Sequence, residues 1–178
     1  MGTQLEMLSR LVKSGTTRDF EAVYQAELPR VYNFFRYRVG DDQIAEDLTA
    51  ETFEKAWRYR QRYRDDLASF STWLFTIARR VAMDHFRKRR PTVPLEEAAH
   101  VADPQILEEA AQQRAEFAHL SRLLSRLAER ERELVALKYG AELTNRAIAR
   151  ISGLSESNVS TILYRVIQQL RAQLENEP

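Results

Sequence analysis

Polar side chains between positions 156 and 165 recur at the spacing of one helix face, and their chemistry suits the reading of DNA bases. An Asn amide can bond adenine, and an Arg guanidinium can bond guanine or phosphate. Apolar residues alternate with them, so the opposite face would pack inward. The polar set is Glu156, Ser157, Asn158, Ser160, Thr161 and Arg165. We predict that this segment is a recognition helix for the major groove.

The residues just before this segment fit the first helix and the turn of a helix-turn-helix. Ile148 and Ala149 give an apolar position and a small one where two helices would cross closely. Gly153 supplies the positive φ that a tight turn needs. Thr144 and Ser155 are placed to cap the two helices. A plain helical hairpin has the same spacing, and it stays the alternative to DNA binding.

A cluster of cations near the middle of the chain suits a nucleic acid with unpaired bases. Cations neutralise phosphates, and neighbouring aromatic rings stack on bases. Phe70, Trp73 and Phe86 recur at helical spacing and are expected in the core, whereas Tyr59 and Tyr63 lie in a polar segment and are the stacking candidates. The cations are Arg79, Arg80, Arg87, Lys88, Arg89 and Arg90, opposed locally by Asp84 alone.

An acidic edge runs along an earlier segment, where Asp47, Glu51 and Glu54 share one helix face. Like charges at this spacing cost a few tenths of a kcal/mol per pair in an isolated helix. A basic partner surface would neutralise them. The alternative is a solvated face, with Lys55 and Arg58 relieving the repulsion.

Two Glu-x-x-His tetrads, at 97–100 and 116–119, offer a rival interpretation as ligands of a di-iron helical bundle. The first tetrad lies between Pro94 and Pro104, where a long core helix is disfavoured. The two copies are also too close in sequence for two full-length bundle helices. A di-iron enzyme is therefore a remote alternative, and we expect no metal site, cofactor or catalytic residue.

The composition indicates an all-α protein. Among 178 residues there are five Gly and five Pro, 44% are hydrophobic, and apolar residues recur at intervals of three and four. The absence of Cys suits the reducing cytoplasm. No apolar run reaches membrane-spanning length and no signal peptide is evident, so we expect a soluble cytoplasmic protein without membrane insertion.

The distribution of charged residues and of proline along the chain indicates separate segments. Residues 1–90 carry 17 Lys and Arg against 13 Asp and Glu, whereas residues 91–178 carry 10 against 13. Pro91, Pro94 and Pro104 interrupt any helix within an acidic stretch. We predict an N-terminal extension at 1–18, a helical domain at 19–90, a flexible acidic linker at 91–105 and a second helical domain at 106–178. Helices are expected near 19–38, at 44–57 after a cap at Asp42, from Ser69 or Ser71, at 106–127 and at 131–139.

Three segments, in this order and spacing, resemble bacterial sigma factors of the extracytoplasmic-function (ECF) type. Residues 44–57 resemble the helix that binds core RNA polymerase, and residues 70–90 resemble the helix that melts the promoter. Residues 127–132 with the helix-turn-helix resemble the part that reads the −35 element. The resemblance covers roughly residues 19–175. It implies an alternative sigma factor made of sigma regions 2 and 4.

The resemblance also implies roles for individual residues. Core polymerase, through its β′ clamp, would contact Asp47, Leu48, Glu51 and Glu54. The −10 element would be held by Tyr59, Tyr63, Ser71, Arg80, Arg87, Lys88 and Arg90. The −35 element would be read by Arg146, Ser157, Asn158, Ser160, Thr161 and Arg165.

Further partners follow from the same resemblance, namely the β flap of the polymerase, promoter DNA and an anti-sigma factor. The acidic linker would enter the polymerase channels. A helix-turn-helix regulator that binds DNA without polymerase is the main alternative, but it leaves the acidic helix and the basic segment without a role.

Overall fold

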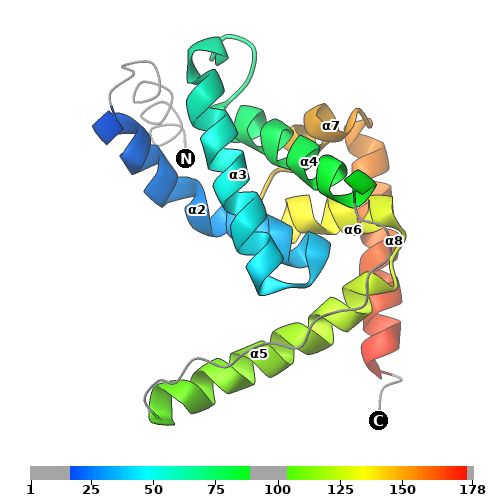
Figure 1. Ribbon diagram of the computed structural model, residues 1–178. Coiled ribbons are helices and arrows are strands. Elements are labelled where there is room, and N and C mark those ends of the chain that lie inside the picture. Colours follow the sequence, from blue (N-terminus) through cyan, green and yellow to red (C-terminus); the bar gives the residue numbers. More distant parts are fainter. Residues whose placement is uncertain (1–16, 89–103, 176–178) are drawn as a thin grey trace.

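The structure, a computed structural model, describes residues 17–88 and 104–175, and every regular element in these ranges is a helix (Figure 1). The predicted all-α class is therefore confirmed, and the helices begin and end within a few residues of their expected positions. The elements are α2 (Thr17–Val39), α3 (Asp42–Tyr59), the short 3-10 helix η1 (Arg60–Arg62), α4 (Phe70–Lys88), α5 (Pro104–Ser125), α6 (Glu129–Val135), the π-helical turn η2 (Ala136–Gly140), α7 (Asn145–Ser152) and α8 (Glu156–Glu175).

Helices α2, α3 and α4 form the N-terminal half. Their apolar stripes meet in one core, in which Phe34 stacks edge-on against Phe75 with ring centroids 5.9 Å apart. Tyr24 of α2 packs in the same way against Phe53 of α3, at 4.6 Å. Edge-to-face pairs add about 0.5–1.5 kcal/mol each beyond their buried area. Packing against α2 thus holds α3 and α4 in a fixed relation to each other.

The turn between α2 and α3 differs by one residue from the prediction. Asp42 is not the cap; Asp41 Oδ1 accepts the backbone N–H of Ile44 at 2.8 Å. The reason is Gly40, whose φ of 71° ends α2 and reverses the chain directly before Asp41. Asp42 then lies in the first turn of α3, where its carboxylate accepts from Arg36 Nε at 2.6 Å.

Helices α6, η2, α7 and α8 form the C-terminal half. Leu134, Leu137, Ile148 and Val159 are all fully buried between these elements. The preceding helix, α5, begins at Pro104, two residues before the predicted start, and contacts the end of α2. There the Arg36 guanidinium lies 3.6 Å from the centre of the Phe117 ring.

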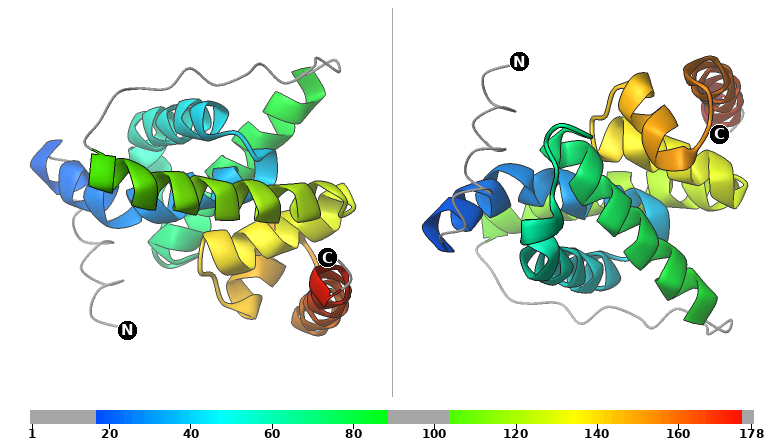
Figure 2. Two further views of the ribbon diagram at one scale, coloured as in Figure 1. Left: turned by 90° about the horizontal axis from the view of Figure 1, so that it is seen from below. Right: turned by 90° about the horizontal axis from the view of Figure 1, so that it is seen from above.

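The two halves pack against each other, which the sequence did not predict. Helix α2 lies along η2, and α4 contacts α7 (Figures 1 and 2). Gly140 permits the closest approach, because a Cβ there would lie 2.8 Å from the carbonyl oxygen of Asn33. The buried residues of both halves form one continuous cluster. The predicted linker lies outside the described residues except for positions 104 and 105, which begin α5.

Candidate nucleic-acid interface and acidic helix face

Residues 144–165 form the predicted helix-turn-helix. Gly153 has a φ of 75° and ends α7 in the left-handed conformation. Thr144 Oγ1 accepts the N–H of Ala147 at 3.2 Å, and Ser155 Oγ accepts the N–H of Asn158 at 3.2 Å. Both predicted caps are thus confirmed, and they fix where the two helices begin.

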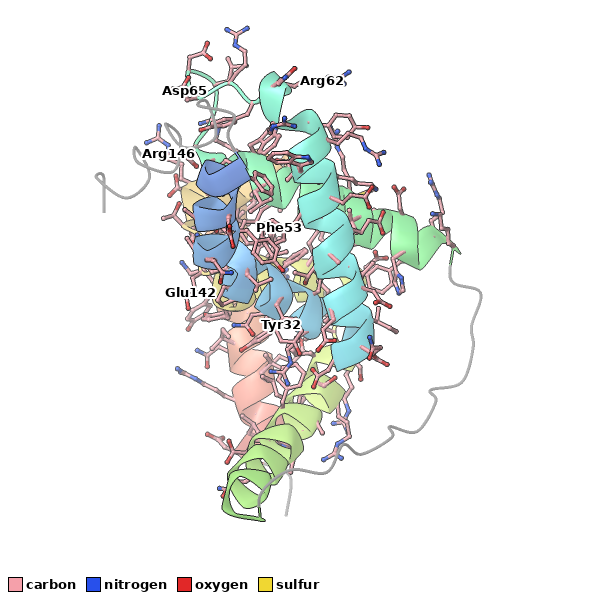
Figure 3. All side chains as sticks on the ribbon, turned by 60° about the vertical axis from the view of Figure 1, so that its left-hand side comes forward. Tyr32, Phe53, Arg62, Asp65, Glu142 and Arg146 are labelled. Carbon is pink, nitrogen blue, oxygen red and sulfur yellow. The ribbon has the colours of Figure 1, made fainter. Side chains whose placement is uncertain are left out.

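The predicted polar face of α8 is exposed. Val159 is fully buried and Leu163 is 5% exposed, so the inward face of the helix is anchored in the C-terminal core. Arg146, at the start of α7, is also exposed, and Figure 3 shows it at the same end of the molecule as Asp65. The outward residues Glu156, Ser157, Asn158, Ser160, Thr161 and Arg165 are all open to solvent.

Two hydroxyls on this face already use their protons inside the helix. Ser160 Oγ donates to the carbonyl of Glu156 at 3.0 Å, and Thr161 Oγ1 donates to that of Ser157 at 3.0 Å. Ser160 Oγ also accepts from Asn145 Nδ2 at 2.9 Å. Asn145 was not predicted to belong to this face, because its partner Ser160 is fifteen residues away on the next helix. The two hydroxyls therefore present acceptor lone pairs to the outside.

The basic end of α4 is exposed as expected. Arg80, Arg87 and Lys88 all reach solvent, and Arg87 pairs with Asp84 at 3.0 Å. That exposed pair contributes little stability, so the guanidinium stays available for another anion. Arg90, the last predicted cation of this set, lies outside the described residues.

The two tyrosines predicted to stack on bases lie in different environments. Tyr59 is 38% exposed at the end of α3, with the Arg62 guanidinium 5.1 Å from its ring centre. Tyr63 lies in the loop after η1, within the predicted polar segment, but it is only 6% exposed. Its ring packs against Phe70 and Trp73, and its hydroxyl donates to the carbonyl of Ala68. The polar residues around Tyr63 in the sequence give no indication that its ring packs in the core.

Ser71, predicted to contact the −10 element, is buried as well. Its hydroxyl donates to Glu27 Oε1 at 2.9 Å and accepts from Arg30 Nη1 at 3.3 Å. Glu27 is 2% exposed, and Arg30 pairs with its other oxygen at 2.9 Å. In this structure the Ser71 hydroxyl serves a buried carboxylate that requires it as a hydrogen-bond donor. A DNA contact at Ser71 stays a prediction.

The acidic face of α3 has the predicted geometry. Asp47 and Glu54 are exposed, and the Glu51 carboxylate lies 2.7 Å from Lys55 Nζ. Glu54 pairs with Arg58 one turn further on. Leu48, which was predicted to contact the same partner, is 5% exposed and lies in the core, so its contact with a partner stays a prediction. The face that a partner can reach therefore carries mainly carboxylates and cations, with the exposed Ala50 between Asp47 and Glu54.

A shallow groove of about 360 Å³ runs between η2 and α8. Tyr139 and Tyr164, which are 47% and 68% exposed, are its largest rings. Ile167 adds apolar surface, and Lys138 and Arg171 add positive charge. This groove could not be predicted from the sequence, because its two walls come from separate helices.

The described residues contain no group of three or more His, Asp or Glu side chains placed to hold a metal ion. The first Glu-x-x-His tetrad lies outside the described residues. In the second, His119 contacts the Arg122 guanidinium at 3.3 Å. Among the described helices, none is both long and apolar enough to cross a bilayer.

Comparison with known families matches both halves of the chain. The family model of Sigma-70 region 2 matches residues 23–92, and that of Sigma-70 region 4 matches residues 123–172. The first range contains α3 and α4, and the second contains the helix-turn-helix.

Curated relatives are similar along most of the chain. The ECF RNA polymerase sigma factor SigM of Bacillus subtilis is 30% identical over 85% of this chain and 93% of its own length. BldN of Streptomyces coelicolor, also an ECF sigma factor, is 29% identical over 97% of this chain, which spans 66% of BldN, just under two thirds.

Two solved structures have the same fold. CnrH in complex with the cytosolic domain of CnrY has a TM-score of 0.70 at 23% identity, over 96% of this chain and 97% of CnrH. The sigma factor RpoE of Bartonella quintana, in complex with the anti-sigma factor NepR, has a TM-score of 0.67 at 21% identity, over 91% of this chain and all of RpoE.

Proposed function

The chain belongs to the ECF family of RNA polymerase sigma factors. We propose that separate exposed surfaces of the chain contact core polymerase, the −10 element and the −35 element. As an alternative sigma factor it acts in transcription initiation. Its own part is to bind and to position, while the polymerase carries out the chemistry. We place it in the cytoplasm, where core polymerase works.

The acidic face of α3 is the proposed contact with core polymerase, through the basic residues of the β′ clamp. Asp47 is exposed and has no ion-pair partner among the described residues, while Glu51 and Glu54 pair only with neighbours on their own helix. Exposed pairs one turn apart are worth about 0.3–0.5 kcal/mol, so a basic partner can displace them at low cost. The observation that carries the proposal is this row of carboxylates, which one helix holds in place and whose ion pairs a partner can displace.

The basic end of α4 and the ring of Tyr59, at the end of α3, are the proposed sites for the −10 element. Arg80, Arg87 and Lys88 would hold phosphates, and Tyr59 would stack on an unpaired base. Arg90 stays in the proposal as the next cation along the chain. Trapping unstacked bases in this way would drive promoter melting without nucleotide hydrolysis.

The outward face of α8, with Arg146 of α7, is the proposed reader of the −35 element. Asn158 and Arg165 can each make two hydrogen bonds to a base edge. Ser160 and Thr161, whose protons are used within the helix, would accept hydrogen bonds from adenine or cytosine amino groups. Ser157 would contact the backbone or an adjacent base.

The groove between η2 and α8 is the proposed seat of the β flap. Tyr139, Tyr164 and Ile167 give it the apolar and aromatic content typical of the centre of a protein interface. The predicted linker would run in the polymerase channels. An anti-sigma factor is a further proposed partner, because both similar structures are complexes with a second protein, which in the RpoE complex is the anti-sigma factor NepR.

Neither half should bind promoter DNA tightly by itself, because each offers few base contacts. When polymerase holds both at a fixed separation, the second contact becomes intramolecular and its effective concentration reaches the millimolar range. Specificity thus arises in the holoenzyme. A polymerase-independent regulator would bind its site without this help.

Charge reversal tests the polymerase contact. The double variant Asp47→Arg, Glu51→Arg should weaken binding to core polymerase at least 100-fold in a fluorescence titration, because like charges then meet across the interface. Its matched control is Glu21→Arg, an exposed carboxylate on α2 outside every proposed surface. If both variants retain wild-type affinity and fold, the acidic face is not the contact.

A further inference from the structure

Asn145, the first residue of α7, contacts the proposed reading face of α8 from the neighbouring helix. Helices α7 and α8 pack against each other (Figure 1). The side-chain Nδ2 of Asn145 donates to Ser160 Oγ at 2.9 Å. Ser160 is exposed, whereas Asn145 is half-buried. Asn145 therefore supports a proposed base-reading residue without being one of the outward residues of α8.

The Ser160 hydroxyl has no proton left for a base. A serine hydroxyl has one proton and two lone pairs. Its proton is donated to the carbonyl of Glu156 at 3.0 Å, and one lone pair accepts from Asn145. The second lone pair remains, and the side chain is exposed to solvent. As long as both bonds are in place, Ser160 can only accept a hydrogen bond from DNA.

The Glu156 side chain adds a second acceptor to the same face. Glu156 lies four residues before Ser160, one helical turn nearer the start of α8, and it is exposed. An ionised carboxylate only accepts hydrogen bonds, and its partner in the major groove is the amino group of cytosine. It also repels phosphates, so this edge of α8 suits base edges better than the DNA backbone.

The stability of α7 does not explain the Asn145 side chain. The cap of α7 is Thr144, whose Oγ1 accepts the N–H of Ala147 at 3.2 Å. Asn145 Oδ1 is buried and has no hydrogen-bond partner among the described residues. A buried carbonyl oxygen without a donor is unfavourable, so an amide that served stability alone would use both of its ends. What the Asn145 amide does provide is the bond to Ser160.

The four bases differ in what they offer to a pair of acceptors. In the major groove adenine and cytosine present an amino group, which donates, whereas the guanine and thymine carbonyl oxygens only accept. An amino group facing Ser160 or Glu156 gains a hydrogen bond. A carbonyl in its place leaves two acceptors facing each other without a proton between them. We expect this mismatch to weaken binding about tenfold, near the lower end of what one good base contact supplies.

We infer that Asn145 is a positioning residue that holds Ser160 as an acceptor, so that Ser160 and Glu156 select adenine or cytosine at neighbouring positions of the −35 element. The inference rests on the proposed function of α8 and adds Asn145 and Glu156 to it. Without Asn145 the Ser160 hydroxyl is free to rotate, and its proton can reach a guanine or thymine carbonyl. Loss of Asn145 therefore relaxes the choice of base at the position that Ser160 reads.

A set of promoters with single base changes measures this choice. Holoenzyme made with the full-length chain binds promoters in which each −35 position carries each of the four bases in turn, while the −10 element stays constant. Wild-type holoenzyme should prefer adenine or cytosine about tenfold, on one strand, at two neighbouring positions. Asn145→Ala should reduce the preference to less than about threefold at one of them and leave the other positions unchanged.

Double variants test whether Asn145 acts through Ser160. Ser160→Ala should relax the same position, and adding Asn145→Ala to it should change nothing further, because both substitutions remove one shared contact. Glu156→Gln should relax the neighbouring position, and its effect should add to that of Asn145→Ala. The matched control is Gln169→Ala, which removes an exposed amide of α8 outside every proposed surface and should leave all base preferences unchanged.

Several results would overturn this role of Asn145. They are an unchanged preference in Asn145→Ala, an equal loss of affinity on every promoter, and additive effects of Asn145→Ala and Ser160→Ala. A wild-type preference for guanine or thymine at the position that depends on Ser160 would also refute it. If the wild-type holoenzyme distinguished no base at any −35 position, the proposed function of α8 itself would fail.

Urea unfolding of each variant separates these outcomes from a loss of folding.

Discussion

The two regions of this sigma factor that we propose to face DNA are built in opposite ways. On α8 every polar residue of the proposed reading face is exposed, and the helix is anchored by buried residues on its other side. At the start of α4 the polar and aromatic residues are buried, with Ser71 tied to Glu27 and Tyr63 packed on Phe70. Of the residues proposed for the −10 element, Tyr59, Arg80, Arg87 and Lys88 reach solvent. The proposed −35 reader is an exposed polar face on an anchored helix, whereas the proposed −10 site is a buried platform with exposed cations and one exposed ring at its edges.

The largest expected effect tests the buried platform. Tyr63→Ala should lower the free energy of unfolding by about 3 kcal/mol, because it removes a packed ring from the core. Asn158→Ala, on the exposed face of α8, should change it by less than about 0.5 kcal/mol. Urea unfolding of both variants measures the difference. Equal stabilities would show that the ring of Tyr63 does not pack in the core.

The difference between the two regions follows from what a sequence pattern can specify. The helix-turn-helix depends on local signals, namely Gly153, two caps and a helical repeat, and all were predictable. Tyr63 and Ser71 lie in a polar stretch, and their burial depends on contacts with α2 and with Trp73 that no local pattern encodes. Leu48 was assigned by resemblance to a binding face, although the helical repeat places it among the core residues.

The packing of the halves was beyond sequence analysis for the same reason. The partners Arg79 and Glu133 are 54 residues apart, and in sequence each resembles any surface charge. The predicted domain boundaries suggested two bodies on a flexible connection. The structure shows that the two halves pack against each other. Gly140, which lets the backbones of the two halves approach closely, is a sign of this packing in the local sequence.

A second prediction sharpens the role of α8. Arg165→Ala should weaken holoenzyme binding to a promoter by about 10- to 100-fold, because loss of a good contact to a base costs about 1–3 kcal/mol. The loss should disappear on promoters mutated at the −35 base that Arg165 reads, and it should persist on promoters mutated at −10. Filter binding with both promoter sets measures this. An equal loss on every sequence would reassign Arg165 to phosphate.

A third, smaller effect concerns the rim of α4. Replacing Arg80, Arg87 and Lys88 together by Gln should lower the slope of log affinity against log salt by about 2–3, since each phosphate contact contributes about 0.7–0.9. The loss of affinity should be uniform across promoter sequences. A wild-type slope in the triple variant would place the −10 strand elsewhere on the N-terminal half.

Run-off transcription on genomic fragments tests the central claim most directly. Reactions contain core polymerase alone, the purified chain alone, or both. We predict initiation at a small set of defined sites when both are present, and no sequence-specific duplex binding by the chain alone. Tight, selective binding by the chain alone, with no defined start sites when core is added, would contradict the account.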